Sequence, residues 1–356
     1  MENIADRNRK ERVDAIIRAR YDNLGHEAEI IFHQGKNPHG SLEDYLQALK
    51  KHWVSYSEYM YQYEFWKLTE EERDKYVSRL RMQSFYHHNV SRSIQNLFKD
   101  KVAFLKLFSE YVHRDWLRVK DSSYDDFFNL LSKADCIAKP INGTCGKGIQ
   151  FIPKNDASVN KDELKEMFGK MQYQDILLEE NIRGAIGLQS FHPSSLNTIR
   201  VVTISNGEKA EIIKYAGFRT GRGRNFVDNT HAGGIISTID ANTGIIVSDG
   251  FDINGYYYVT HPDSNLPFKG FKIDGWESVR NTCLEAAKTT LNPITGWDVT
   301  INTKGQVELI EGNHAPDFDG VLQAPLKCGI KDSIAEKIRT ILGMDLMKDS
   351  QVDGLN

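Results

Sequence analysis

The sequence lacks several features that would assign it to a well-marked class. It has no apolar run long enough to cross a bilayer, so we expect no membrane span. Its formal net charge of −4 gives no reason to expect a nucleic acid as partner. The four cysteines are scattered without metal-ligand spacing, and the N-terminus lacks the apolar core of a signal peptide. Together these absences predict a cytoplasmic location.

The chain is long enough to bury a large core. With 356 residues and 40% hydrophobic content, we expect two or three lobes. Residues 1–98 show helical spacings and no βαβ pattern, and the rest mixes helices with antiparallel strands, which predicts an α+β fold. Further helices are predicted at 100–112, 124–133, 161–171, 275–291 and 331–342. Strands are predicted at 136–152 around a loop, at 176–182, in an antiparallel series to about residue 259, and at 297–311.

The most informative segment lies near the C-terminus and predicts a β-hairpin with oxygen ligands. Two apolar strands flank a polar turn, Thr303–Gln306, that contains a glycine. Asp298 lies on the first strand, and Glu311 and Asn313 lie two residues apart on the second, so the last two share a face. Such oxygen ligands suit Mg²⁺, which takes one or two carboxylates and adds water and phosphate.

A second segment, 136–152, indicates a strand, a glycine-rich loop and another strand. Gly143, Gly146 and Gly148 would let the backbone approach a phosphate and turn its N–H groups toward it. The segment is not a P-loop, because the Gly-x-x-x-x-Gly-Lys-Ser/Thr spacing is missing and no helix signal follows. An ordinary hairpin loop is the alternative interpretation.

These segments, in this order, resemble parts of the ATP-grasp superfamily. The C-terminal hairpin resembles its metal-binding hairpin, and the strand ending in Lys139 and Pro140 resembles its phosphate-binding strand. Over roughly the last two-thirds of the chain, the sequence also resembles the sugar-transfer-associated ATP-grasp family of bacterial surface-polysaccharide gene clusters. The motifs are Asn197-Thr-x-Arg200, Asp228-Asn-x-His231-x-Gly-Gly, His261-Pro-Asp263 and Gly296-Trp-Asp298.

The resemblance implies an ATP-grasp fold, in which two α+β lobes clamp ATP, with a helical N-terminal region in place of a Rossmann-like lobe. The implied division is a helical N-terminal region at 1–98, lobe 1 at 99–182, lobe 2 at 183–345 and a tail at 346–356.

The resemblance also implies a role for each matching residue. Asp298 and Glu311 would hold one Mg²⁺, and Glu311 and Asn313 a second, with Mn²⁺ able to substitute. Lys101 and Lys139 would contact ATP phosphates. The predicted strand at 176–182 matches the superfamily hinge between the two lobes, so Glu179, Glu180 and Ile182 would lie beside adenine. Glu180 or Gln189 would bind the ribose. The implied cofactor-binding residues are Lys101, Lys139, Gly143, Gly146, Gly148, Glu179, Glu180, Ile182 and Asn197.

Arg200 is the first candidate for catalysis. Its guanidinium would hold the γ-phosphate or the acceptor carboxylate through two parallel hydrogen bonds. An ion pair on a sheet face is the alternative interpretation. Lys139, Arg219 and His231 are further candidates, and His231 would either transfer a proton or order its own loop.

The implied activity is that of an ATP- and Mg²⁺-dependent carboxylate–amine ligase that works through an acyl-phosphate. Family context indicates a sugar acid as the carboxylate and an amino acid or simple amine as its partner, in surface-glycan biosynthesis. Two alternatives stay open: a phosphotransferase (kinase) acting on a hydroxyl, and a non-catalytic nucleotide-binding module. The complete set of metal ligands argues against the second alternative. The sequence names neither the substrates nor the oligomeric state.

Overall fold

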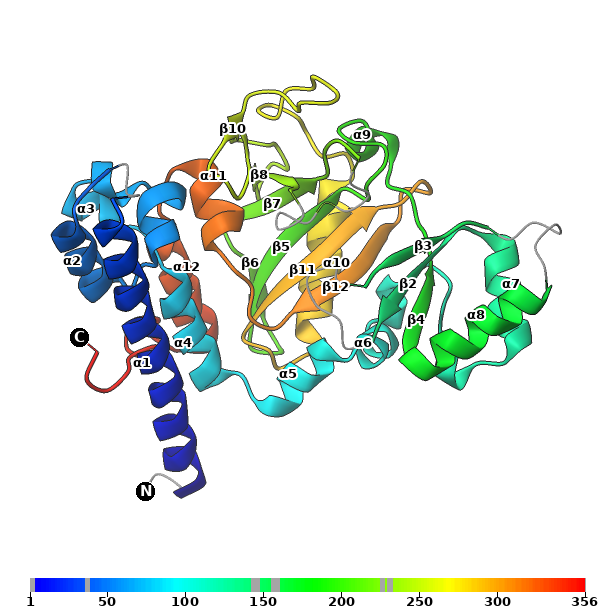
Figure 1. Cartoon of the computed structure of the whole chain (residues 1–356), viewed down its shortest axis with the longest axis horizontal. Coiled ribbons are helices and arrows are strands. Elements are labelled where there is room, and N and C mark those ends of the chain that lie inside the picture. Colours follow the sequence, from blue (N-terminus) through cyan, green and yellow to red (C-terminus); the bar gives the residue numbers. More distant parts are fainter. Residues whose placement is uncertain are drawn as a thin grey trace.

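The computed structural model describes residues 4–35, 39–141, 148–154, 161–224, 228 and 233–355. Two antiparallel sheets lie side by side, and a group of N-terminal helices stands at the far side of the larger one (Figure 1). The predicted α+β fold with a helical N-terminal region is confirmed. No helix in these ranges combines the length and the hydropathy needed to cross a membrane.

The first part of the chain is helical, as predicted. Its helix starts use side-chain caps: Ser41 accepts a hydrogen bond from the Asp44 N–H, and Thr69 forms a capping box with Glu72. Between the helices, an aromatic group that includes Trp53 is buried in the local cores. The elements are α1 (Ile4–His33), α2 (Leu42–His52), η1 (Glu58–Gln62), η2 (Phe65–Lys67), α3 (Glu70–Arg73), α4 (Arg79–Asn89) and α5 (Arg92–Lys99).

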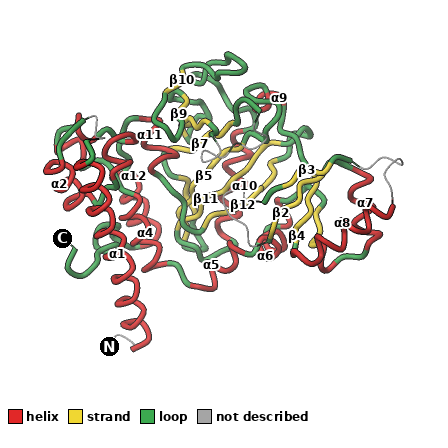
Figure 2. Tube along the Cα trace, viewed as in Figure 1, coloured by secondary structure: helices red, strands yellow, loops and turns green. Residues whose placement is uncertain are grey.

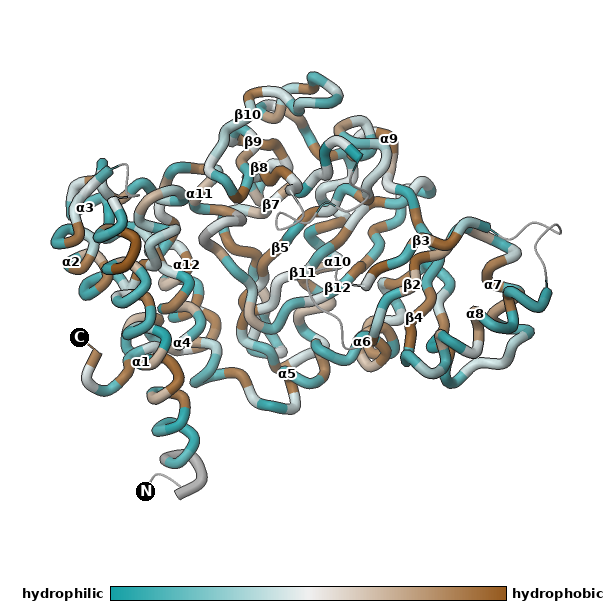
Figure 3. The backbone as a smooth tube through the Cα atoms, in the orientation of Figure 1, coloured by the Kyte–Doolittle hydropathy of each residue, from teal (hydrophilic) through white to brown (hydrophobic). Residues whose placement is uncertain are grey.

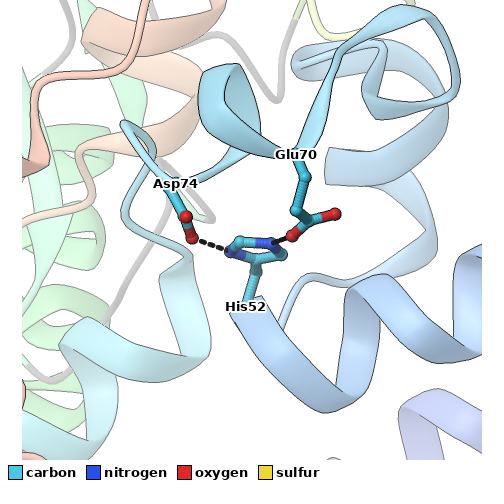
Figure 4. A group of neighbouring side chains, drawn as sticks. All are labelled: His52, Glu70 and Asp74. Carbon is cyan, nitrogen blue, oxygen red and sulfur yellow. Dashed lines mark hydrogen bonds and ion pairs between the residues drawn. The ribbon is translucent and has the colours of Figure 1, made fainter.

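Where α2 meets α3, three side chains form a charged network (Figure 4). His52 lies between two carboxylates: its Nε2 is 2.6 Å from Glu70 Oε1, and its Nδ1 is 3.7 Å from Asp74 Oδ1. The Lys51 ammonium lies 2.9 Å from the same Glu70 oxygen. The two ring nitrogens face different carboxylates, and Lys51 pairs with both, so the network links the end of α2 to α3 and the residue that follows it.

The smaller sheet has four antiparallel strands in the order β1-β4-β2-β3. Cys136, Ala138 and Leu178 pack with the helices on one face, so Lys139 and Glu179 point to the opposite face. The three-residue strand β1 was not predicted, because so short a strand has no alternation pattern. The elements are α6 (Lys101–Leu107), η3 (Ser109–Tyr111), β1 (Trp116–Arg118), η4 (Val119–Asp121), α7 (Tyr124–Lys133), β2 (Cys136–Pro140), β3 (Gln150–Ile152), α8 (Lys161–Gln174) and β4 (Ile176–Glu180).

The larger sheet has eight strands in the order β10-β9-β8-β7-β5-β11-β12, with β6 paired to β5 (Figure 2). Its elements are α9 (Ile186–Gln189), β5 (Thr198–Ser205), β6 (Ala210–Ile212), β7 (Tyr215–Thr220), β8 (Ile235–Asp240), β9 (Gly250–Phe251), β10 (Tyr257–Tyr258), α10 (Trp276–Lys288), β11 (Ile294–Ile301), β12 (Val307–Asn313), η6 (Asp319–Gln323), α11 (Ala324–Leu326), α12 (Lys331–Lys337) and η7 (Ile338–Leu342).

The central strand β5 contributes apolar side chains to a core on each of its two faces. Figure 3 shows hydrophobic segments along the strands of the larger sheet. Ile199 and Val201 share a core with α10, whereas Val202 and Ile204 share another with α4 and α12. Because side chains alternate along a strand, Arg200 lies on the face away from α10. This face carries the charged group described below.

The helices on either side of residue 100 connect the N-terminal region to the larger sheet. The side chains of Phe98 and Phe108 contact the ring of Trp297 on β11. Asp100 caps α6 as predicted, accepting hydrogen bonds from the backbone N–H groups of Val102 and Ala103. The division of the chain at residues 98, 182 and 345 remains a proposal, and the packing of Phe98 crosses the first of these points.

Candidate active site

The predicted hairpin is formed by β11 and β12. Asp298 lies directly opposite Glu311, and Gly296 lies opposite Asn313. Cross-strand partners project from the same side of a sheet, so three oxygen-bearing side chains share one face. The pairing shifts register immediately after Asp298, and such a bulge bends its strand and redirects the neighbouring side chains.

The glycines beside these side chains are required by close packing. A Cβ atom on Gly312 would lie 2.7 Å from ring atoms of both Phe98 and Phe104. A Cβ on Gly296 would lie 2.7 Å from Pro316 and 3.2 Å from the Cδ of Arg200. Gly296 and Gly312 therefore leave the space that the neighbouring side chains occupy.

Two arginines approach Asp298 from the neighbouring strands. Arg200 pairs in register with Asp298, and its Nη2 lies 2.8 Å from Asp298 Oδ2 while its Nε bonds the other oxygen. Arg219 Nη1 lies 3.0 Å from Asp298 Oδ2. Opposite Arg200 on β7 stands Gly217, which has no side chain between the two arginines. The ion-pair interpretation of Arg200 thus describes this structure, with the predicted metal ligand as the partner.

The carboxyl groups of this face influence one another. Burial would raise the pKa of Asp298, but Arg200 and Arg219 hold it well below its ordinary value. Loss of solvation and the adjacent negative charge of Asp298 raise the pKa of Glu311, although both arginines oppose the rise. Asp298 therefore keeps its negative charge more readily than Glu311 does. Crowded carboxylates of this kind favour a cation between them.

Asp228 is a member of this group that sequence reasoning did not assign to the site. Its Oδ2 accepts hydrogen bonds from the N–H, at 3.0 Å, and the hydroxyl of Thr198. Its Oδ1 lies 3.7 Å from Arg219 Nη2. Arg219 therefore lies between two carboxylates, Asp228 and Asp298. The only signal in the sequence was the position of Asp228 in the Asp-Asn-x-His motif.

The smaller sheet contributes a second group of charges. Lys139 forms an ion pair with Glu179, and the Lys101 ammonium donates a hydrogen bond to the Ile141 carbonyl at 3.0 Å. Burial and the neighbouring Lys139 lower the pKa of Lys101, while Glu311 and Glu179 partly offset that effect. Lys101 therefore lies close enough to charged side chains of both sheets to interact with them electrostatically.

Glu179 is also bound by Arg114, which no motif indicated. Arg114 Nη2 lies 2.8 Å from Glu179 Oε1, and its Nη1 lies 2.7 Å from Glu308 Oε1 on β12. Burial would raise the pKa of Glu179, but Arg114 and Lys139 lower it to about 2. The Glu179 side chain is therefore an anion inside the protein, bound by two cations.

The remaining cofactor candidates fall into separate places. Gly148 adopts a φ of +75°, and a Cβ there would lie 2.9 Å from Pro140, so glycine is needed at this point. Gly143, Gly146 and His231 lie outside the described residues. The backbone N–H of Glu180 donates to the Asp115 carbonyl at 2.8 Å.

Asn197 is fully buried in the loop before β5. Its Nδ2 donates to the carbonyls of Leu188, at 2.9 Å, and His192, at 3.1 Å, and its Oδ1 accepts a bond from Ser195. Gln189 uses its side chain within the same loop, bonding the Pro193 carbonyl at 2.8 Å. This geometry gives both amides a loop-ordering role and does not bring them to the charged face.

The hairpin with its arginines, opposite a sheet that bears an ion-paired lysine, is the arrangement expected of an ATP-grasp protein. A model of the family described as sugar-transfer associated ATP-grasp matches residues 80–336. The chain belongs to this family, and the resemblance found in its motifs is confirmed. No curated protein sequence matches the chain significantly.

Solved structures with low sequence identity are similar in part. They include the ATP-grasp ligase PsnB complexed with a minimal precursor, at 14% identity and a TM-score of 0.43, covering 74% of this chain and 63% of that one. They also include a D-alanine–D-alanine ligase from Coxiella burnetii (13% identity, TM-score 0.40, 72% and 58% coverage). A third is an L-amino acid ligase from Bacillus licheniformis (12%, 0.39, 66% and 48%). The chain spans less than two thirds of each of these proteins.

Proposed function

We propose that this protein is an ATP- and Mg²⁺-dependent ligase that joins a carboxylate to an amine. The observation that carries the proposal is the face of β11 and β12, where Asp298, Glu311 and Asn313 lie beside the guanidinium groups of Arg200 and Arg219. Such a face combines ligands for a hard cation with groups that bind carboxylate or phosphate.

The donor set fits Mg²⁺. Asp298 and Glu311 lie opposite each other on the two strands, in a position where two anions would repel each other. The amide oxygen of Asn313 would bind Mg²⁺. The buried Nδ2 of the same amide has no hydrogen-bond partner among the described residues, and as a donor it would be left to meet a phosphate oxygen. Asp298 and Glu311 would hold one ion, and Glu311 and Asn313 the second, with Mn²⁺ able to replace Mg²⁺. The bound ions would neutralise the transferring phosphoryl group.

The nucleotide would lie between the two sheets. Lys101 and Lys139 would bind its phosphates, together with backbone N–H groups of the loop that ends at Gly148. The N–H of Ile182, just after β4, makes no hydrogen bond to any residue that the structure describes, and it would meet the adenine edge. The need for ATP agrees with the cytoplasmic location predicted from the sequence.

The arginines would act on the second substrate. Asp298 engages Nε and Nη2 of Arg200 and Nη1 of Arg219, so these donors are not available to an anion. A cation held by Asp298 and Glu311 would compete for the same carboxylate oxygens and so release Arg200 and Arg219. The released groups would orient the acceptor carboxylate toward the γ-phosphorus, Arg200 through two parallel hydrogen bonds.

The overall reaction needs no nucleophilic side chain. A carboxylate oxygen of the acceptor would form a bond to the γ-phosphorus as the bond to ADP breaks, giving an acyl-phosphate. The amine would then bond to the acyl carbon, phosphate would leave, and the amine would lose a proton to solvent. The acceptor we propose is a sugar acid, and the amine is an amino acid or simple amine, in bacterial surface-glycan biosynthesis.

Hydroxylamine trapping tests the proposal. The purified protein, ATP, Mg²⁺ and a panel of sugar acids would be incubated with hydroxylamine, which attacks an acyl-phosphate and yields a hydroxamate. We expect hydroxamate with at least one sugar acid, and none with Glu311→Gln. A stable phosphate ester of the acceptor, without hydroxamate, would instead identify a kinase acting on a hydroxyl. Binding of ATP without any product across the panel would favour a non-catalytic module.

A further inference from the structure

Four buried charges form a line between the two sheets. Lys139 pairs with Glu179, Glu179 with Arg114, and Arg114 with Glu308 on β12. The side chains of Arg114, Glu179 and Glu308 are 2%, 3% and 1% exposed, whereas that of Lys139 is 20% exposed. The line is therefore closed to solvent at the β12 end and reaches solvent at the lysine.

All three nitrogen atoms of the Arg114 guanidinium donate hydrogen bonds. Its Nε and Nη2 both bond Glu179, at 3.1 and 2.8 Å, and its Nη1 bonds both Glu308 and the Leu309 carbonyl, at 2.7 and 2.8 Å. Its Nη2 also reaches the Ile310 carbonyl at 3.3 Å. These contacts attach β4 to β12, the strand that carries Glu311. Glu311 directly follows Ile310, whose carbonyl accepts one of these hydrogen bonds.

The charges also explain how Lys139 can change partners. Glu179 is buried and has two cationic partners, so it keeps its two hydrogen bonds to Arg114 when Lys139 departs. Without Arg114, the same departure would leave a buried carboxylate with no partner, which is strongly unfavourable. The four charges sum to zero, and Lys139 is the only one of them with access to an incoming ligand.

We propose that Arg114 is a positioning residue that shares Glu179 with Lys139 and thereby lets Lys139 leave for a nucleotide phosphate. The inference rests on the proposed function, because it takes Lys139 to be a phosphate-binding group. Arg114 itself touches neither nucleotide nor acceptor. By sharing the Glu179 carboxylate, Arg114 weakens the ion pair between Glu179 and Lys139. Because a guanidinium has donors on two sides, Arg114 binds Glu308 at the same time.

The test measures binding of MgADP to the full chain by calorimetry. The double variant Arg114→Met with Glu308→Gln removes one cation and one anion, so the remaining pair of Lys139 and Glu179 stays neutral. We expect this variant to bind MgADP at least about tenfold more weakly, because Glu179 then holds Lys139 alone. Adding Glu179→Gln should restore the affinity to within about threefold of the wild type, since nothing then retains the lysine.

Controls separate this effect from loss of structure. Arg118 Nη2 lies 2.6 Å from Asp175 Oδ2 in the same sheet, and the matched double variant Arg118→Met with Asp175→Asn should bind MgADP like the wild type. Circular dichroism and urea unfolding would confirm that each variant folds. If the first double variant fails to fold, Arg114→Lys replaces it, because one ammonium cannot serve both glutamates, and weaker binding is again expected.

The outcomes are distinct. MgADP affinity unchanged in the Arg114 variants would overturn the inference while leaving the proposed function intact. An affinity that stays low after Glu179→Gln is added would also overturn it, because Arg114 would then matter only for structure. A wild-type protein that does not bind MgADP would refute the proposed function itself.

Discussion

Replacing Glu179 with glutamine should make the protein less sensitive to acid. Glu179 has a pKa of about 2 in the folded protein, against an ordinary value of 4.5. A carboxyl group whose pKa is lowered by folding stabilises the native state at pH values above its unfolded pKa. That contribution is lost as the pH falls from 4.5 toward 2, because the unfolded chain then binds the proton more tightly.

The size of the effect follows from the shift. Each pKa unit corresponds to about 1.4 kcal/mol, so a shift of about 2.5 units contributes on the order of 3 kcal/mol at neutral pH. At pH 3, about 2 kcal/mol of this contribution should already be gone, because the unfolded carboxyl is almost fully protonated there. The Glu179→Gln variant has no such group to titrate.

Urea unfolding at pH 7 and pH 3 measures the effect. The free energy of unfolding should fall between these values by about 2 kcal/mol more in the wild type than in Glu179→Gln. Glu180→Gln makes the same chemical change at the next residue, whose side chain is only partly buried, and should keep the wild-type loss. Equal losses in wild type and Glu179→Gln would refute the ion-pair account of Arg114 and Lys139.

Three further predictions concern single positions. Gly312→Ala should lower the free energy of unfolding, measured in urea, by about 1–3 kcal/mol, because its Cβ would clash with two phenylalanine rings. The control Gly169→Ala has open space around the new Cβ and should not lower the free energy of unfolding. Asn197→Ala should lower the same free energy by about 1–3 kcal/mol, because the buried amide loses its hydrogen bonds to the carbonyls of Leu188 and His192. The folded fraction of that variant should bind ATP as tightly as the wild type. Weaker ATP binding by correctly folded protein would indicate that Asn197 contributes to the nucleotide site. Asn313→Asp should change the ratio of Mg²⁺- to Mn²⁺-supported turnover, and an unchanged ratio would count against it as a ligand.

Much of the fold follows from local sequence patterns. The hairpin of β11 and β12 was predictable because apolar strands flank a glycine turn, and the two strands do pair as a hairpin, with Asp298 opposite Glu311. Helix α7 begins and ends at the predicted residues, and its Ser123 cap explains the start. The predicted helix at 100–112 was too long, since α6 ends at Leu107 and a 3₁₀ turn follows.

The site was less predictable, because its contacts join residues far apart in the chain. Arg114 meets Glu308 across 194 positions, and nothing in the local pattern around either residue indicates such a pair. Within the predicted antiparallel series, the chain that returns after residue 210 is divided into β6 and β7. That division allows β7 to take its place beside β5 and to present Arg219 next to Asp298. Tertiary pairing of this kind is not encoded in periodicity alone.

The most direct test of the account is the effect of Mg²⁺ on nucleotide affinity. Calorimetric titration with a non-hydrolysable ATP analogue would be compared with and without Mg²⁺ in the wild type, in Glu311→Gln, and in the control Glu277→Gln on the exposed side of α10. We predict that Mg²⁺ strengthens binding by at least about tenfold, or 1.4 kcal/mol, in the wild type and the control, and not in Glu311→Gln. Equal strengthening in all three proteins would contradict the assignment of the metal site to this hairpin.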